Sequence, residues 1–240
     1  MSIYGLAITE FWTGRPGLWK RCPEMFTALM STPKREVSPS RVHLNALIRV
    51  VNNAGGWDQF DQDVLESAIL LDKFLALTKF KSLLLPLMWD PVTITPGLVE
   101  SAVASWLGQD LLVKPVSRDL YILLQDIISY MKYTVNYWPS TERQATIGTN
   151  FFLKLQVLIY RLLHLSRLSE LDNCIRLTTL VFQLSVTQYH GSQVAAMTFI
   201  PRLRQALIVA RFWEDGVAED LRFWCLYTGA MAAEASPDKD

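Results

Sequence analysis

The chain has 240 residues, and its 23 basic and 23 acidic side chains give a formal net charge of zero at pH 7. Half of the residues are apolar and 19% are charged. This composition excludes disordered and collagen-like chains and predicts a packed globular core. The balanced charge creates no long-range field that would attract nucleic acid or an anionic membrane.

The cysteines and the N-terminus bear on the compartment. Cys22, Cys174 and Cys225 are far apart and odd in number, and none belongs to a Cys-x-x-Cys pair, so the spacing disfavours a disulfide framework and a zinc knuckle. Residues 1–10 lack the basic region and continuous apolar core of a secretory signal, and no apolar run is long enough to span a bilayer. We therefore expect an intracellular protein without a membrane segment.

The first elements follow from turn residues and apolar spacing. Residues 1–41 contain several Gly and Pro residues, which predicts helical pieces joined by loops. From Val42 onward the apolar residues recur at helical spacing, and Gly55 and Gly56 should end this first clear helix, because glycine readily adopts the left-handed conformation of a helix C-terminus.

The next helix is preceded by three aspartates that should cap its start, namely Asp58, Asp61 and Asp63. It covers residues 64–80 and is apolar on most faces, so we expect it to be central. The proline-rich middle of the chain should contain at most a short helix over residues 98–107.

Two serines mark later helix starts. Ser117 should cap a helix whose apolar stripe runs from Leu120 to Met131 and which ends before Pro139. Ser169 and Asp172 have the Ser-x-x-Asp form of a capping motif and should open another helix.

The remaining boundaries rest on similar signals. A capping box at residues 141–144 opens a helix that reaches Leu163, and the helix after the Ser-x-x-Asp motif should end near Gly191. A further helix should run from Pro201 to near Gly216, and the last one covers residues 218–234.

These patterns predict an all-α fold, because two-residue alternation bounded by hairpin turns is missing between the apolar runs. We expect a single multi-helix domain of antiparallel packed helices. In this prediction residues 1–41 form an irregular helical segment, residues 42–234 the domain and residues 235–240 a polar tail.

The histidines and acidic pairs do not form a reactive centre. His43, His164 and His190 lie more than twenty residues apart, without a spacing that places two metal ligands on one helix face. The pairs Glu214-Asp215 and Glu219-Asp220 fit helix-end charges better than a paired acid and base.

A cysteine nucleophile is also disfavoured. Cys174 could in principle pair with His164 or His190, but burial in an apolar helix raises the pKa of a thiol. The sequence therefore assigns no catalytic residue, no cofactor and no metal.

Binding motifs are similarly weak. Neither glycine-rich phosphate loop occurs, and the basic residues form no cluster suited to a nucleic-acid groove: Lys34, Arg35, Arg202, Arg204 and Arg211. The eight tryptophans and eleven phenylalanines could line a ligand pocket, but their helical spacing favours core positions. We expect no direct DNA binding, with Arg202 and Arg204 on the exposed side of a helix that buries Leu203 and Leu207.

Two blocks of sequence resemble a known family. Residues 43–60 form a histidine-headed helix that ends in a Gly-Gly turn, and an apolar helix over residues 64–80 follows. Residues 221–234 carry Trp224 and a late Gly229-Ala element. Together with Leu6-Ala7, Glu10 and Gly14, these blocks resemble the regulatory regions of fungal-specific transcription factors of the Zn2Cys6 type.

The resemblance implies a helical regulatory scaffold rather than a chemistry. This chain lacks the six-cysteine zinc cluster of such factors. The implied role is a non-enzymatic transcription regulator, nuclear in location, that acts through a protein partner, a homodimer or a small-molecule effector rather than through direct DNA contact. The alternative is a helical small-molecule-binding protein or enzyme with an aromatic-lined cavity.

Overall fold

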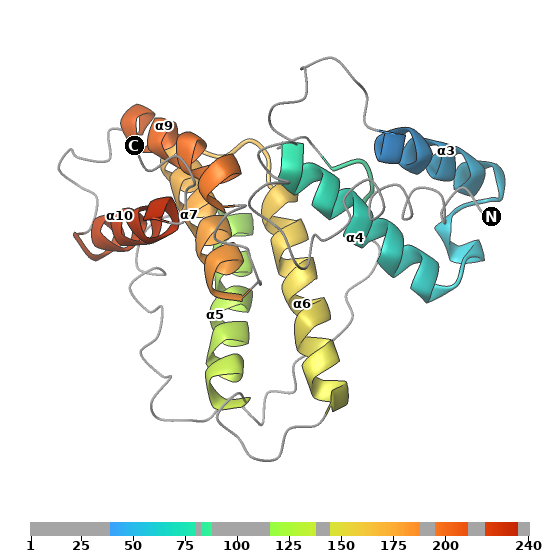
Figure 1. The fold of residues 1–240 in the computed structure, drawn as a ribbon, viewed down its shortest axis with the longest axis horizontal. Helices are drawn as coiled ribbons and strands as arrows, with labels where there is room; N and C mark the ends of the chain where they lie inside the picture. The colour runs from blue at the N-terminus through green and yellow to red at the C-terminus, as the bar shows by residue number, and fades with distance from the viewer. Residues whose placement is uncertain are drawn as a thin grey trace. The chain divides into compact units, whose positions relative to one another are not determined.

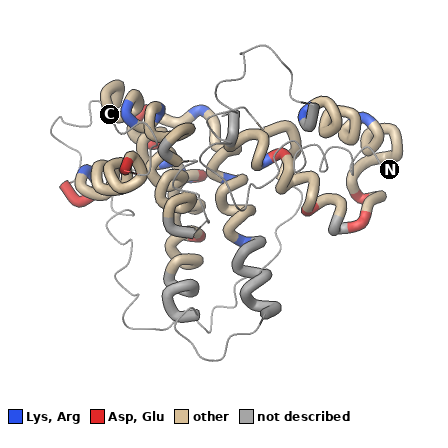
Figure 2. Tube along the Cα trace, in the orientation of Figure 1, with Lys and Arg blue, Asp and Glu red and all other residues tan. Residues whose placement is uncertain are grey.

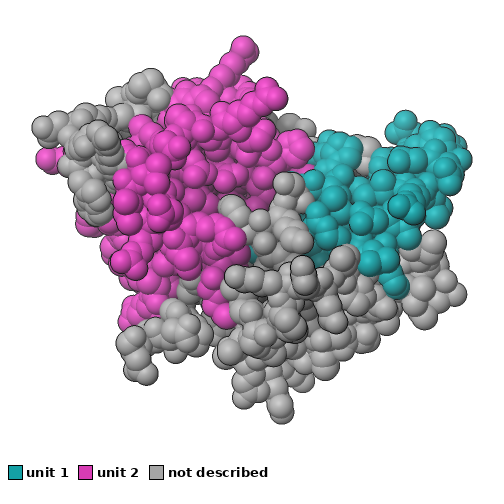
Figure 3. Space-filling model, turned by 90° about the horizontal axis from the view of Figure 1, so that it is seen from above, with its two compact units in different colours: residues 1–89, 237–240 teal, residues 90–236 magenta. Residues whose placement is uncertain are grey.

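The computed structural model describes the following residues: 39–79, 83–87, 116–137, 145–187, 195–210 and 219–234. These residues form helices and short connections without any strand, so the all-α prediction is confirmed (Figure 1). The chain separates into two compact units, residues 1–89 with 237–240 and residues 90–236 (Figure 3). Antiparallel packing of the helices stays a prediction.

The first unit contains α3 (Pro39–Asn53), which ends at the expected glycines. The amide of Gly56 donates to the carbonyl of Val51 at 3.0 Å, and the amide of Gly55 donates to that of Asn52 at 3.3 Å. These bonds are the two that define a Schellman motif. Gly55 and Gly56 have φ values of +97° and +116°, a region that L-residues rarely adopt. The predicted Gly-Gly stop is therefore confirmed.

After the short 3-10 helix η1 (Trp57–Gln59), α4 spans Gln62–Lys79 and matches the helix expected over residues 64–80. The main-chain carbonyl of Asp61 accepts the amides of Val64 and Leu65, whereas capping by the side chains of Asp58, Asp61 and Asp63 stays a prediction. The buried residues of α4 occur around much of its circumference: Ala68, Ile69, Leu71, Asp72, Lys73, Leu75, Ala76 and Leu77. This burial agrees with the expectation of a central helix.

A buried carboxylate links α4 to the following chain. Asp72 Oδ2 accepts the amides of Leu84 and Leu85 at 2.7 and 2.9 Å. Hydrogen bonds to a charged acceptor are worth more than neutral ones, so Asp72 holds residues 83–87 against α4.

The first helices described in the second unit are α5 (Arg118–Tyr137) and α6 (Ala145–His164), which lie side by side (Figure 1). Both helices bury leucine and isoleucine side chains, and Arg161 of α6 forms an ion pair with Asp126 of α5. The apolar stripe that predicted α5 is buried at Leu120, Leu123, Leu124 and Ile127.

Helix α7 (Glu170–Thr187) contacts α6, α9 and α10 and is the centre of this unit. As predicted, Ser169 caps it, because its Oγ accepts the amide of Asp172 at 3.1 Å. The hydroxyls of Thr178 and Thr179 donate to the carbonyls four residues earlier, which allows these side chains to be buried.

The predicted cap at Ser117 is corrected by the structure. Its carbonyl accepts the first helical bond of α5, from Tyr121, but its buried hydroxyl makes no hydrogen bond among the described residues. Instead, the amide of Ser117 donates to Asp172 Oδ2 at 3.2 Å. A long-range carboxylate thus ties the beginning of α5 to the beginning of α7, a link that local sequence patterns do not contain.

The C-terminal part contains a π-helical turn, η5 (Ala195–Phe199), followed by α9 (Ile200–Val209) and α10 (Glu219–Glu234). Pro201 lies in the first turn of α9, as expected. Helix α9 and helix α10 both pack against α7, and they also contact one another.

Several sequence expectations fall outside the described residues. These are the short helix over residues 98–107, the capping box at residues 141–144 and the ends near Gly191 and Gly216. Of the N-terminal segment 1–41 only the last three residues are described, as the start of α3, and the tail 235–240 is not described. The predicted domain boundaries therefore stay predictions.

Candidate functional site

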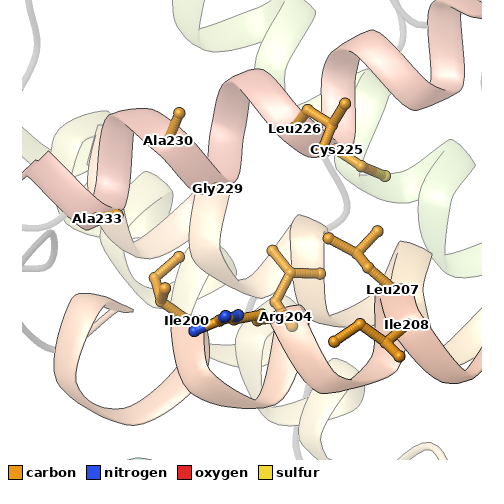
Figure 4. Close-up of a pocket in the computed structure, with 10 residues that line it drawn as sticks. Ile200, Arg204, Leu207, Ile208, Cys225, Leu226, Gly229, Ala230 and Ala233 are labelled. Atoms are coloured by element: carbon orange, nitrogen blue, oxygen red, sulfur yellow. The ribbon is translucent and has the colours of Figure 1, made fainter.

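An apolar groove lies between α9 and α10 in the second unit (Figure 4). It has a volume of about 330 Å³. Each helix contributes five lining residues: Ile200, Leu203, Arg204, Leu207 and Ile208 from α9, and Cys225, Leu226, Gly229, Ala230 and Ala233 from α10. On each helix these positions recur at intervals of three or four, so one face of α9 and one face of α10 form the walls.

The groove forms because α10 is narrow where it passes α9. A Cβ atom added to Gly229 would lie 3.5 Å from Leu203 Cδ2, which is ordinary van der Waals contact. Ala230 and Ala233 are also small. These positions leave space above the buried side chains of Leu203 and Leu207, and a large residue at position 229 would fill it.

An exposed apolar surface continues from the groove along α10. We define the outer stripe of α10 as Phe223, Leu226, Tyr227, Ala230 and Met231. Phe223, Tyr227 and Met231 are 69%, 55% and 52% exposed, and the rings of Phe223 and Tyr227 stack with centroids 5.7 Å apart. The opposite face of the same helix is buried at Leu221, Cys225, Thr228 and Ala232. Contiguous exposed apolar surface of this kind marks interaction sites.

Arg204 is the charged residue of the groove lining. Figure 4 shows its side chain beside Ile200 on the α9 wall. As predicted, Arg202 and Arg204 are exposed while Leu203 and Leu207 are buried. Arg202 donates to the carbonyl of Thr198, whereas the guanidinium of Arg204 has no hydrogen bond or ion pair among the described residues.

The groove does not contain a reactive thiol. Burial raises the pKa of Cys225 to about 12, and the neighbouring Cys174 contributes to the increase while a hydrogen bond with Thr178 opposes it. Burial, together with the charge of Glu170, also raises the pKa of Cys174 to about 12. The expectation that these thiols are buried with raised pKa values is confirmed, and both cysteines are free. Cys22 lies outside the described residues.

The other sequence candidates do not converge. His43 lies in α3, His164 is exposed in the last turn of α6, and His190 lies outside the described residues. Glu219 and Asp220 occupy the first turn of α10, where carboxylates stabilise the helix dipole. The described part of the chain brings together no three His, Cys, Asp or Glu side chains in an arrangement that could hold a metal ion.

Charged residues are distributed over several helices, as Figure 2 shows for the described ranges. Arg211, Lys34 and Arg35 lie outside these ranges. Within them, no helix combines the length and apolarity that crossing a membrane requires.

Comparison with known proteins provides no relative for this chain, since no family model, curated protein or solved structure matches it. The resemblance to fungal regulatory regions therefore contributes only to the proposal below. The groove and its surroundings carry the functional argument.

Sequence patterns located neither this groove nor the outer stripe. The tryptophans and phenylalanines were expected at core positions, but no aromatic residue lines the groove. Among the aromatic residues of α10 only Trp224 is half-buried, with its ring centroid 6.5 Å from that of Phe182. Phe223 and Tyr227 are exposed. The sequence does contain a signal for the exposed stripe. The charged residues of α10 lie near its ends and its middle is apolar on both faces, although packing against one neighbour requires only one apolar face.

Proposed function

We propose that this chain is a non-enzymatic helical interaction domain that regulates transcription in the nucleus by binding a protein partner through the α9–α10 groove. The observation that carries the proposal is the outer stripe of α10, which extends the groove as exposed apolar surface. Leu226 and Ala230 belong to both the groove and the outer stripe, so the two form one surface. The continuity of this surface beyond the groove suits a macromolecule.

The transcription-regulator part of the proposal rests on the resemblance of residues 43–60 and 221–234 to fungal regulatory regions. The second block coincides with α10, so the segment that carries the resemblance also forms one wall of the groove. Binding through a partner agrees with the lack of net charge, because specific DNA binding draws on several phosphate-neutralising cations.

A small-molecule site is the second candidate. The groove volume of about 330 Å³ is close to the lower limit of typical ligand pockets, about 300 to 1,000 Å³. An apolar ligand in this groove would still leave Phe223, Tyr227 and Met231 exposed, since none of them lines it. Partner binding explains both the groove and these residues, so we favour it.

The test tethers the chain to a heterologous DNA-binding domain and measures transcription of a reporter in a fungal host. Leu226→Glu places a charge in the groove. The matched control is Ile122→Glu on α5 of the same unit, because Ile122 is 41% exposed and Leu226 is 38% exposed. We expect tethering to change reporter transcription, Leu226→Glu to abolish the change and Ile122→Glu to preserve it. Unaltered transcription, or equal effects of the two substitutions, would contradict the proposal.

A further inference from the structure

We infer that the occupant of the α9–α10 groove is a short amphipathic helix of a partner protein that carries an acidic side chain opposite Arg204. This inference rests on the proposed function and names the chemistry of its partner.

The dimensions of the groove fit a helix of about two turns. Its walls extend from Ile200 to Ile208 on α9 and from Cys225 to Ala233 on α10. Eight residue steps along a helix correspond to about 12 Å, the length of slightly more than two turns. Two or three apolar side chains at i, i+3 or i+4, and i+7 of a partner helix would fall within this length.

The charge of the lining specifies a polar feature of the partner. Helix α9 carries Arg202 and Arg204 and no acidic residue. The acidic residues of α10 lie at its ends and do not line the groove: Glu219, Asp220 and Glu234. Because the guanidinium of Arg204 is unpaired among the described residues and borders apolar surface, a carboxylate on the occupant would form a charge-assisted pair there.

A second copy of this chain fits less well. The surface that α10 would present to a neighbouring groove is its outer stripe, whose face carries carboxylates only beyond its two ends, at Asp220 and Glu234. Each lies seven residues from Tyr227 in the middle of that face, about 10 Å along the helix. Arg204 lies in the middle of the α9 wall, so a partner helix with an acidic residue in the middle of its apolar face matches the groove better than a second α10 does.

The probe is a displayed library of amphipathic helical peptides of about 16 residues, long enough to cover the groove with one extra turn at each end. Its apolar positions are randomised, and one position beside them is Glu, Gln or Lys. The library is selected against the full chain, and the affinities of selected peptides are measured by fluorescence anisotropy. We expect enrichment of Glu over Gln and Lys.

The decisive step is a charge exchange. Arg204→Glu should weaken binding of the Glu peptide about tenfold or more, and replacing the glutamate of the peptide by arginine should restore it. Arg118→Glu is the matched control, because Arg118 is an exposed arginine at the start of α5 in the same unit, and it should leave the affinity unchanged. Gly229→Leu should abolish peptide binding by filling the groove. Leu226→Glu should also abolish it, and this second variant keeps the test valid if the fold does not accept a leucine at position 229.

Four outcomes would overturn the inference, and the last of them leaves the proposed function standing. The first is equal enrichment of Glu, Gln and Lys in the selected peptides. The second is that arginine in place of the peptide glutamate does not restore the binding affinity lost in Arg204→Glu. The third is a dimer in sedimentation experiments that Gly229→Leu dissociates, since the occupant would then be a second copy. If no peptide is selected while Leu226→Glu still abolishes the reporter response and Ile122→Glu does not, the inference fails but the proposed function stands.

Discussion

Replacing Lys73 by methionine should stabilise the first unit in a pH-dependent manner. The side chain of Lys73 has no exposed surface, and its Nζ has no hydrogen-bond partner among the described residues. Nζ lies 4.1 Å from the ring centroid of Phe74, which offsets only part of the desolvation. Burial therefore lowers the pKa of Lys73 from 10.5 to about 7.

The sign of the pH dependence follows from this depressed pKa. Between about pH 7 and pH 10.5 the unfolded chain holds a proton at this lysine that the folded chain has released, so stability increases with pH in that window. Below about pH 7 the lysine is charged in both states, and the folded state carries the full cost of burial. With 1.36 kcal/mol for each pKa unit, this cost is on the order of 5 kcal/mol at acidic pH.

Methionine has a similar length without the charge, so Lys73→Met removes this cost. Its stability advantage over the wild-type chain should be about 3 kcal/mol larger at pH 6.5 than at pH 9.5. Urea unfolding at the two pH values, followed by far-ultraviolet circular dichroism, measures the difference. Arg49→Met, at an exposed arginine of α3, is the control and should show no comparable change. An advantage that is absent, or that does not vary with pH, would refute the assignment of Lys73 as a buried amine with a lowered pKa.

Three further predictions concern backbone strain, a buried link and nucleic acid. Gly56→Val should lower the free energy of unfolding by more than about 1 kcal/mol, because valine is strained at the positive φ of this position. Gly229→Ala should be tolerated, because its Cβ would make only an ordinary van der Waals contact. Thermal unfolding of the two variants measures this difference. Asp172→Ala should cost about 1 to 3 kcal/mol in urea unfolding, because the amide of Ser117 loses its acceptor. The purified chain should show no sequence-selective duplex binding below about 1 μM in anisotropy titrations at physiological salt, and submicromolar selective binding would restore a direct DNA-binding role.

The helices were predictable because their signals are local. The Schellman motif of α3 needs only the two glycines in sequence, and the cap of α7 needs only Ser169 at the right distance from Asp172. Apolar spacing located α5 and α10 in the same way.

The site was not predictable, because it depends on which face of each helix is buried. Both faces of α10 are apolar, so the spacing of its apolar residues does not reveal that Cys225 is buried and Phe223 exposed. Only packing against α7 and α9 decides this. The role of Asp172 shows the same limit, since its carboxylate binds the amide of Ser117, 55 residues away, rather than closing the local capping motif.

Photo-crosslinking in living cells tests most directly whether the α9–α10 groove binds a protein. A photoreactive amino acid replaces Leu226 in the groove in one version of the chain and Ile122, of similar exposure, in another. We predict a discrete protein adduct from position 226, none from position 122, and loss of the adduct when Gly229→Leu is added. No adduct from position 226, or the same adducts from both positions, would contradict binding of a protein partner at this groove.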